Sequence, residues 1–187
     1  MKLNQIIKNV ATILGLIDVV ELLASNAKAE ELDENLNYRV LMRAGALVLA
    51  NLGANFKTPV TQQTFLANVT NAGRFSLNLF NHPPLAIKDV SAGGRTFAWE
   101  LFSDHLRIIG AMGHVDVTYT FSAAPQSGEE SLPLDIRPEI VEYGILSEFA
   151  FINGMFNEAQ VWNTKMRELL FQDRSSKSIV LPRSFQG

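Results

Sequence analysis

The sequence predicts an α+β protein: a four-helix bundle, interrupted by an antiparallel β meander and followed by an extended C-terminal arm. Apolar residues recur at helical spacing over residues 3–54 and again over residues 138–172. Between these helix pairs, residues 61–122 form short runs in which apolar and polar residues alternate, as they do in strands. Residues 173–187 begin polar and end apolar. We therefore expect a single domain over residues 1–187, built as helix pair, β insert, helical hairpin and arm.

Two apolar stripes predict the first helix pair. The first stripe has the spacing of one helix face and consists of Leu3, Ile6, Ile7, Val10 and Leu14. The second runs over residues 32–52, and Gly53 is expected to end its helix because glycine readily adopts the left-handed conformation of a helix end. The acidic stretch between the stripes, residues 25–34, is expected to be an exposed loop or the first turn of the second helix.

The β insert is predicted from six strand-like runs separated by turn residues. They cover residues 64–70, 74–80, 85–91, 96–102, 105–110 and 114–121. In the last run, Val115, Val117 and Tyr119 would face one side and the polar residues between them the other. We expect an antiparallel meander of five or six strands with one face in solvent. Residues 123–131, rich in Gly, Ser, Pro and Glu, are expected to form a flexible linker.

The helical hairpin is the strongest structural signal in the chain. Pro138 suits a first helical turn, and Asn153 with Gly154 suits the break between the two helices. The first helix is apolar on nearly every side, which is typical of a helix buried in its own core or in an assembly. The second helix carries a single apolar stripe. The residues expected in the hairpin core or at a subunit interface are Tyr143, Phe149, Met155, Trp162 and Met166.

The C-terminal arm is unusually apolar for a chain end. Residues 173–177 are polar and expected to fray, and an apolar stretch with a proline and an aromatic residue follows. Such an end either folds back on its own domain or docks on another chain, by adding a strand to a sheet edge or by filling a groove. The second interpretation is favoured because a flexible end can reach a neighbour. The docking residues would be Arg174, Lys177, Ile179, Val180, Leu181, Pro182, Arg183 and Phe185.

Several classes of chemistry find no support in the sequence. The chain has no cysteine, so thiolate metal sites and cysteine nucleophiles are excluded. Its three histidines, His82, His105 and His114, lack metal-ligand spacing, and neither a phosphate-binding loop nor a nucleophile elbow occurs. The net charge of -3 argues against general nucleic-acid binding by the surface, and no apolar run is long enough to span a membrane. We therefore predict no enzyme, and no catalytic, metal or cofactor-binding residue.

One alternative class stays open. The β insert of an enzyme or a small ligand-binding protein would carry a pocket, and Trp99, His105, His114 and Asp116 would lie near its mouth. A metal site would require His105 and His114 to converge with a neighbouring aspartate.

Four stretches of the chain form a pattern in combination. The first is the opening IIKNVATILGLI, followed by an acidic gap and a second helix over residues 39–52. The second is the β segment, which ends in VDVTYTF before an acidic linker that contains proline. The third is LPLDIRPEIVEYGILSEFAFINGMFNEAQVWNTKMRELL, and the fourth is the ending IVLPRSF. In this arrangement the chain resembles the head-to-tail adaptor proteins of tailed bacteriophages, also called connector or head completion proteins.

The resemblance implies a structural virion protein without a cofactor. Copies of the chain, about twelve, would form a ring that docks under the portal protein, extends the DNA channel and provides the attachment site for tail or nozzle proteins. The helices would form the ring body and the arm would dock on the portal. Genomic DNA would pass through without sequence-specific binding. The protein would assemble in the host cytoplasm and reside at the neck of the virion. The alternative within this class is another neck or tail-completion protein.

Overall fold

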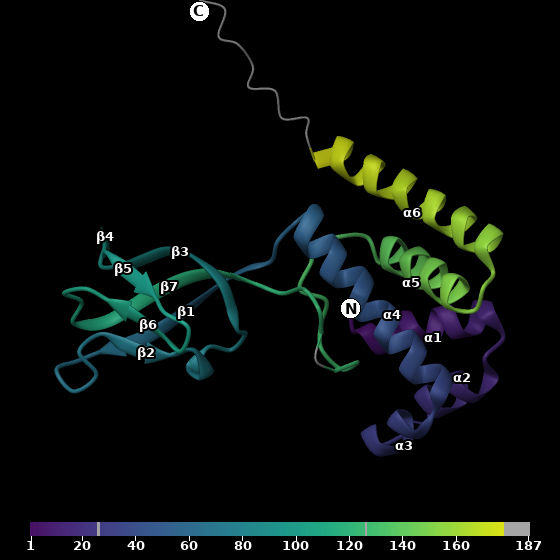
Figure 1. Cartoon of the computed structure of the whole chain (residues 1–187), viewed down its shortest axis with the longest axis horizontal. Helices are drawn as coiled ribbons and strands as arrows, with labels where there is room; N and C mark the ends of the chain where they lie inside the picture. The colour runs from purple at the N-terminus through teal and green to yellow at the C-terminus, as the bar shows by residue number, and fades with distance from the viewer. Residues whose placement is uncertain (26, 126, 178–187) are drawn as a thin grey trace, which may run out of the picture. The chain divides into compact units, whose positions relative to one another are not determined.

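The structure is a computed structural model that describes residues 1–25, 27–125 and 127–177. It has six helices and two antiparallel sheets in this part of the chain, which confirms the predicted α+β class (Figure 1). The chain divides into two compact units. We call residues 1–51 together with the residues from 124 onward the helical unit, and residues 52–123 the β unit.

The helical unit draws on both ends of the chain. Its helices are α1 (Leu3–Leu14), α2 (Ile17–Ala24), α3 (Ala29–Glu34), α4 (Leu36–Asn55), α5 (Pro138–Ile152) and α6 (Phe156–Lys177). Gly15 ends α1 with a φ of 72°. The acidic stretch that was expected to be a loop or the start of the next helix contains a short helix of its own, α3, and the long helix begins only at Leu36. The last turn of α4 belongs to the β unit.

Close packing of α5 defines the centre of the helical unit. Fully buried side chains come from α1, α4 and α5, among them Leu3, Ile6, Ile7, Leu41, Leu49, Ile140, Ile145 and Leu146. Gly144 of α5 lies so near its neighbours that a β carbon there would be 2.6 Å from Val48 Cγ1 on α4. The same carbon would be 3.1 Å from Met166 Sδ on α6. Helix α5 is therefore held tightly between α4 and α6.

Helix α6 is longer than the sequence indicated. We expected the hairpin to end at residue 172 and residues 173–177 to fray, but the helix continues to Lys177. The boundary prediction was wrong because nothing in this polar stretch breaks a helix, and polar side chains suit a helical turn in solvent. Arg174 and Lys177 of the proposed arm are therefore part of the α6 backbone. The other arm residues, Ile179, Val180, Leu181, Pro182, Arg183 and Phe185, lie outside the described residues.

The β unit contains two sheets rather than one meander. Its strands are β1 (Val60–Ala67), β2 (Arg74–Ser76), β3 (Pro84–Ala92), β4 (Arg95–Thr96), β5 (Trp99–Leu101), β6 (His105–Ile108) and β7 (Gly113–Phe121), with a 3-10 helix, η1 (Leu77–Leu79), after β2. One sheet has the order β1-β7-β3-β4 and the other the order β2-β6-β5. The meander prediction was wrong because β1, the first strand, pairs with β7, the last.

A shared apolar core explains the two-sheet arrangement. Alternating strands bury one face, and here both sheets bury theirs against each other. The core includes Phe65, Phe75, Phe80, Ile87, Val90, Leu106, Ile108, Val115, Val117, Tyr119 and Phe121. The extended segment over β4 and β5 serves both sheets, because the Phe97 amide donates to the Val90 carbonyl at 2.8 Å and the Ile109 amide donates to the Ala98 carbonyl at 2.9 Å.

Candidate functional site

The five residues predicted for the hairpin core or interface have three different environments. Phe149 is buried in the helical unit. Tyr143, Trp162 and Met166 are half-buried where α5 and α6 face each other. Met155, in the turn between the helices, is 37% exposed. The apolar stripe of α6 thus serves mainly to attach this helix to α5.

A stacked aromatic pair links the two helices. The rings of Tyr143 and Trp162 lie 5.7 Å apart between centroids, with 14° between their planes. The Lys165 ammonium lies 4.6 Å from the centre of the Trp162 ring and 5.7 Å from that of Tyr143. A cation over an aromatic face is attracted by the ring electrons. The Lys165 charge therefore lies over both rings of this pair.

The turn of the hairpin, in contrast, exposes large apolar side chains. Phe151 is 60% exposed, Ile152 50% and Phe156 62%, and Met155 lies between them in sequence. The rings of Phe151 and Phe156 meet edge to face at 5.5 Å, so these two side chains form one surface, and Ile152 and Met155 are their neighbours in the sequence. We call these four residues the turn patch. Contiguous apolar surface of this kind marks sites that contact another molecule.

A cavity of about 680 Å³ lies elsewhere in the helical unit, among α1, α2, α3 and the start of α4. Its apolar lining includes Leu22, Leu23, Leu32 and Met42. Polar residues from the start of the chain, from α4 and from the segment after the β unit complete the lining, and four of the lining residues form one hydrogen-bonded network.

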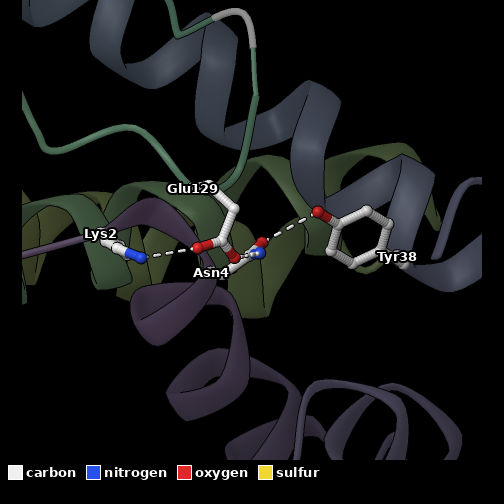
Figure 2. A network of polar contacts seen from close by, with 4 residues as sticks. All are labelled: Lys2, Asn4, Tyr38 and Glu129. Carbon is white, nitrogen blue, oxygen red and sulfur yellow. Dashed lines mark hydrogen bonds and ion pairs between the residues drawn. The ribbon is translucent and has the colours of Figure 1, made fainter. Parts of the chain in front are cut away.

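Figure 2 shows this network of four residues. The buried Tyr38 hydroxyl donates to Asn4 Oδ1 at 2.8 Å, and Asn4 Nδ2 donates to Glu129 Oε1 at 2.6 Å. Lys2 Nζ donates to the other carboxylate oxygen of Glu129 at 2.7 Å. The hydrogen bonds from Lys2 and then Asn4 lower the pKa of the Glu129 carboxyl. Burial raises the pKa of the Tyr38 hydroxyl, and the charge of Asp33 adds to this effect.

The backbone strengthens the same connection. The Asn4 amide donates to the Gly128 carbonyl at 2.8 Å, and the Leu3 amide donates to the Glu130 carbonyl at 3.3 Å. An isolated antiparallel β-bridge between the backbones of Lys2 and Ser131 adds to these contacts. Residues 128–131, part of the segment expected to be a flexible linker, are therefore bonded to the start of α1. Their polar groups have hydrogen-bond partners that are close only in the folded chain.

The polar residues of the β unit do not form a common site. His105 Nδ1 lies 2.7 Å from Asp104 Oδ1, a hydrogen bond that lowers the pKa of the Asp104 carboxyl. A hollow of about 540 Å³ beside His105 is lined by neither Trp99, His114 nor Asp116. Asp116 instead accepts a hydrogen bond from the Thr64 hydroxyl at 2.6 Å. His82 stacks on Phe121 at 4.2 Å. The arrangement expected for a pocket mouth in the β insert is thus not assembled at this hollow.

The described residues also limit other types of site. Among them, no three His, Asp or Glu side chains come together as ligands for a metal ion. Nor is any helix in the described ranges both long and apolar enough to cross a membrane. In comparisons with known proteins, no family model matches the sequence, and neither does any curated protein.

Proposed function

We propose that this chain is a structural protein of a tailed bacteriophage, a head-to-tail adaptor that forms a ring under the portal. The support from the sequence is the arrangement of four stretches that resembles this family. In this proposal α1, α4, α5 and α6 form the four-helix bundle of the ring body, with the β unit inserted between the helix pairs. The residues after α6 form the arm that docks on the portal. The ring extends the DNA channel and receives the tail proteins.

The turn patch is the observation that carries this proposal furthest. Single exposed apolar residues are normal on a monomer, but Phe151 and Phe156 lie in ring contact and both are mostly exposed. Burying them against a neighbouring copy would remove this surface from water. A ring needs such a contact to be heterologous, so that each copy uses one surface to bind the next and a different surface to bind the previous one.

The first experiment measures native mass. The native mass of the purified 187-residue chain is measured alone and after mixing with the portal protein encoded in the same genome. A form that ends at Lys177, the last residue of α6, is treated in the same way. A complex that needs the residues after Lys177 is the expected result. If the 187-residue chain forms no complex with the portal protein at micromolar concentrations, the adaptor proposal is wrong.

A pair of variants tests the turn patch. Phe151→Ser with Phe156→Ser should abolish ring formation on the portal, since both side chains are then too polar to bury at low cost. The control is Phe171→Ser, because Phe171 on α6 is 75% exposed and lies outside the patch. Equal loss of rings in both variants, or in neither, would contradict the role of the patch.

A further inference from the structure

Strand β1 forms an open outer edge of the four-stranded sheet. Among the described residues it pairs with β7 alone, in one continuous register from Val60 to Ala67. The strand contains neither a charged residue nor a proline. Outer strands present unpaired backbone groups that bind other extended chains, and proteins usually prevent such binding with short strands, charges, prolines or bulges. Strand β1 has none of these features.

The other outer strands of the β unit are protected in this way. Strands β2, β4 and β5 are two or three residues long, and each carries a charged residue, Arg74, Arg95 and Glu100 respectively. Beyond its short contact with β4, β3 contains Lys88 and two shifts of register. In the described β unit, a long outer edge without protection therefore occurs at β1, and this contrast favours a role of β1 in binding.

The backbone of β1 presents its free groups at alternate residues. The Phe121 amide donates to the Pro59 carbonyl at 3.2 Å, so the Pro59 backbone faces β7. The direction alternates along an antiparallel strand, and the even-numbered residues therefore face the free side. These residues are Val60, Gln62, Thr64 and Leu66. Asn71 Nδ2 donates to the Leu66 carbonyl at 2.7 Å, and a carbonyl oxygen can accept a second hydrogen bond.

Two copies of β1 match each other in one antiparallel register. With Gln63 at a two-fold axis, Val60 lies opposite Leu66 of the second copy, and Gln62 lies opposite Thr64. The two apolar side chains, 57% and 53% exposed, would then cover each other, and polar side chains would meet polar ones without any charge. A register shifted by two residues would instead place Val60 opposite Thr64, or Leu66 opposite Gln62.

We propose that β1 of one copy pairs with β1 of a second copy in this register, so that two four-stranded sheets become one continuous sheet. The even-numbered residues of each strand then exchange backbone hydrogen bonds with the other strand. Such a contact is isologous, because both copies use the same surface. The inference goes beyond the adaptor proposal, since the contact needs no portal protein and differs from the heterologous contact of a ring.

Sedimentation equilibrium of the 187-residue chain tests the proposal. With rising concentration the average mass should approach twice the 20.7 kDa of one chain. Val60→Lys with Leu66→Lys should weaken this dimer by about tenfold or more, because like charges would lie opposite each other. The control is Leu85→Lys with Ile109→Lys, at positions 63% and 47% exposed and outside β1. A chain that stays monomeric at high micromolar concentrations, or equal effects of the two pairs, would overturn the proposal.

Cysteine cross-linking tests the register without changing the charge of the strand. The chain has no cysteine, so every disulfide comes from introduced residues. Directly opposite residues in a hydrogen-bonded pair have Cα atoms about 5.5 Å apart, which suits a disulfide. On oxidation, a mixture of the Gln62→Cys chain and the Thr64→Cys chain should form a mixed covalent dimer. No cross-link in the mixture, or an equal cross-link in the Gln62→Cys chain alone, would refute the register.

The same data separate this inference from the proposed function. Self-association that is lost in the Phe151→Ser, Phe156→Ser chain but kept in the Val60→Lys, Leu66→Lys chain belongs to the turn patch. This result would overturn the β1 proposal while the adaptor proposal stands. A β1 dimer of a chain that forms no complex with the portal protein would support the β1 contact and contradict the adaptor proposal.

Discussion

Adding one methyl group at Gly144 should destabilise the helical unit, although the same change stabilises most helices. In an exposed helix interior, alanine is more favourable than glycine by about 1 kcal/mol. In α5, however, the new carbon would lie 2.6 Å from Val48 Cγ1 and 3.1 Å from Met166 Sδ. Val48 is 5% exposed and β-branched, so its side chain has neither space nor rotational freedom to move away.

The expected magnitude follows from these opposing terms. Overfilling a packed core costs about 1–3 kcal/mol, which exceeds the helix preference of about 1 kcal/mol. Gly144→Ala should therefore lower the free energy of unfolding by about 1 kcal/mol. Gly45→Ala on α4 is the control, because its nearest contacts are the flexible ends of Leu3 and Ile145 at 3.2 and 3.4 Å. The side-chain ends can shift, so this change should be neutral or slightly stabilising.

A double-mutant cycle with Val48→Ala completes the test. Once the Val48 methyl groups are absent, Gly144→Ala should stabilise the chain, which gives a coupling free energy of about 2 kcal/mol. Urea unfolding is followed by Trp162 fluorescence in a Trp99→Phe background, so that the signal comes from the helical unit alone. The close approach of α4 and α5 is refuted if Gly144→Ala stabilises the chain by about 1 kcal/mol whether or not Val48 is present.

Three further changes test other parts of the structure. The lowered pKa of Glu129 means that its contact with Lys2 stabilises the fold above the unfolded pKa near 4.5 and is lost as the pH falls through the folded pKa. The urea midpoints of the wild type and Glu129→Gln should therefore converge as the pH falls toward 3. Gly73→Ala should destabilise the β unit by about 1–3 kcal/mol in urea unfolding followed by near-ultraviolet circular dichroism, because Gly73 has a φ of 71° and a β carbon there would collide with the Ile108 carbonyl. Phe65→Ala should cost about 3–5 kcal/mol in the same assay, since the ring is 7% exposed and packs 4.9 and 4.8 Å from two other phenylalanine rings.

Local periodicity was sufficient to predict α1, α5, most of α4 and α6, and the faces of several strands. Four of the five residues in the predicted stripe of α1 are buried, with Leu14 only half-buried, and Val115, Val117 and Tyr119 of β7 are buried too. The Gly93–Gly94 pair makes the turn between β3 and β4, where both glycines have positive φ. These features depend on residues within one element or one turn, and for this reason a single sequence reveals them.

Contacts between distant residues could not be predicted in this way. Residues 123–131 have the composition of a flexible linker, and only the folded chain brings Glu129 to Asn4, 125 positions away. The extension of α6 to Lys177 was missed for the opposite reason. A polar stretch carries no apolar stripe, so periodicity gives no sign of a helix that is exposed to solvent.

Strand order shows where the information in such patterns ends. An alternating pattern indicates which side chains of a strand favour a core. It does not indicate the pairing partner, which can be the next strand in the sequence or a strand more than fifty residues away, as in the pair of Thr64 and Asp116. The choice is made by the core as a whole, where rings from both sheets meet. The apolar pattern around the turn patch likewise leaves the contact partner undetermined. Phe151 continues the apolar pattern of a buried helix, yet it is mostly exposed in the isolated chain. The pattern thus records that the side chain favours burial and leaves open whether the partner is this chain or another one, which is why the decisive experiments are those that add a second molecule.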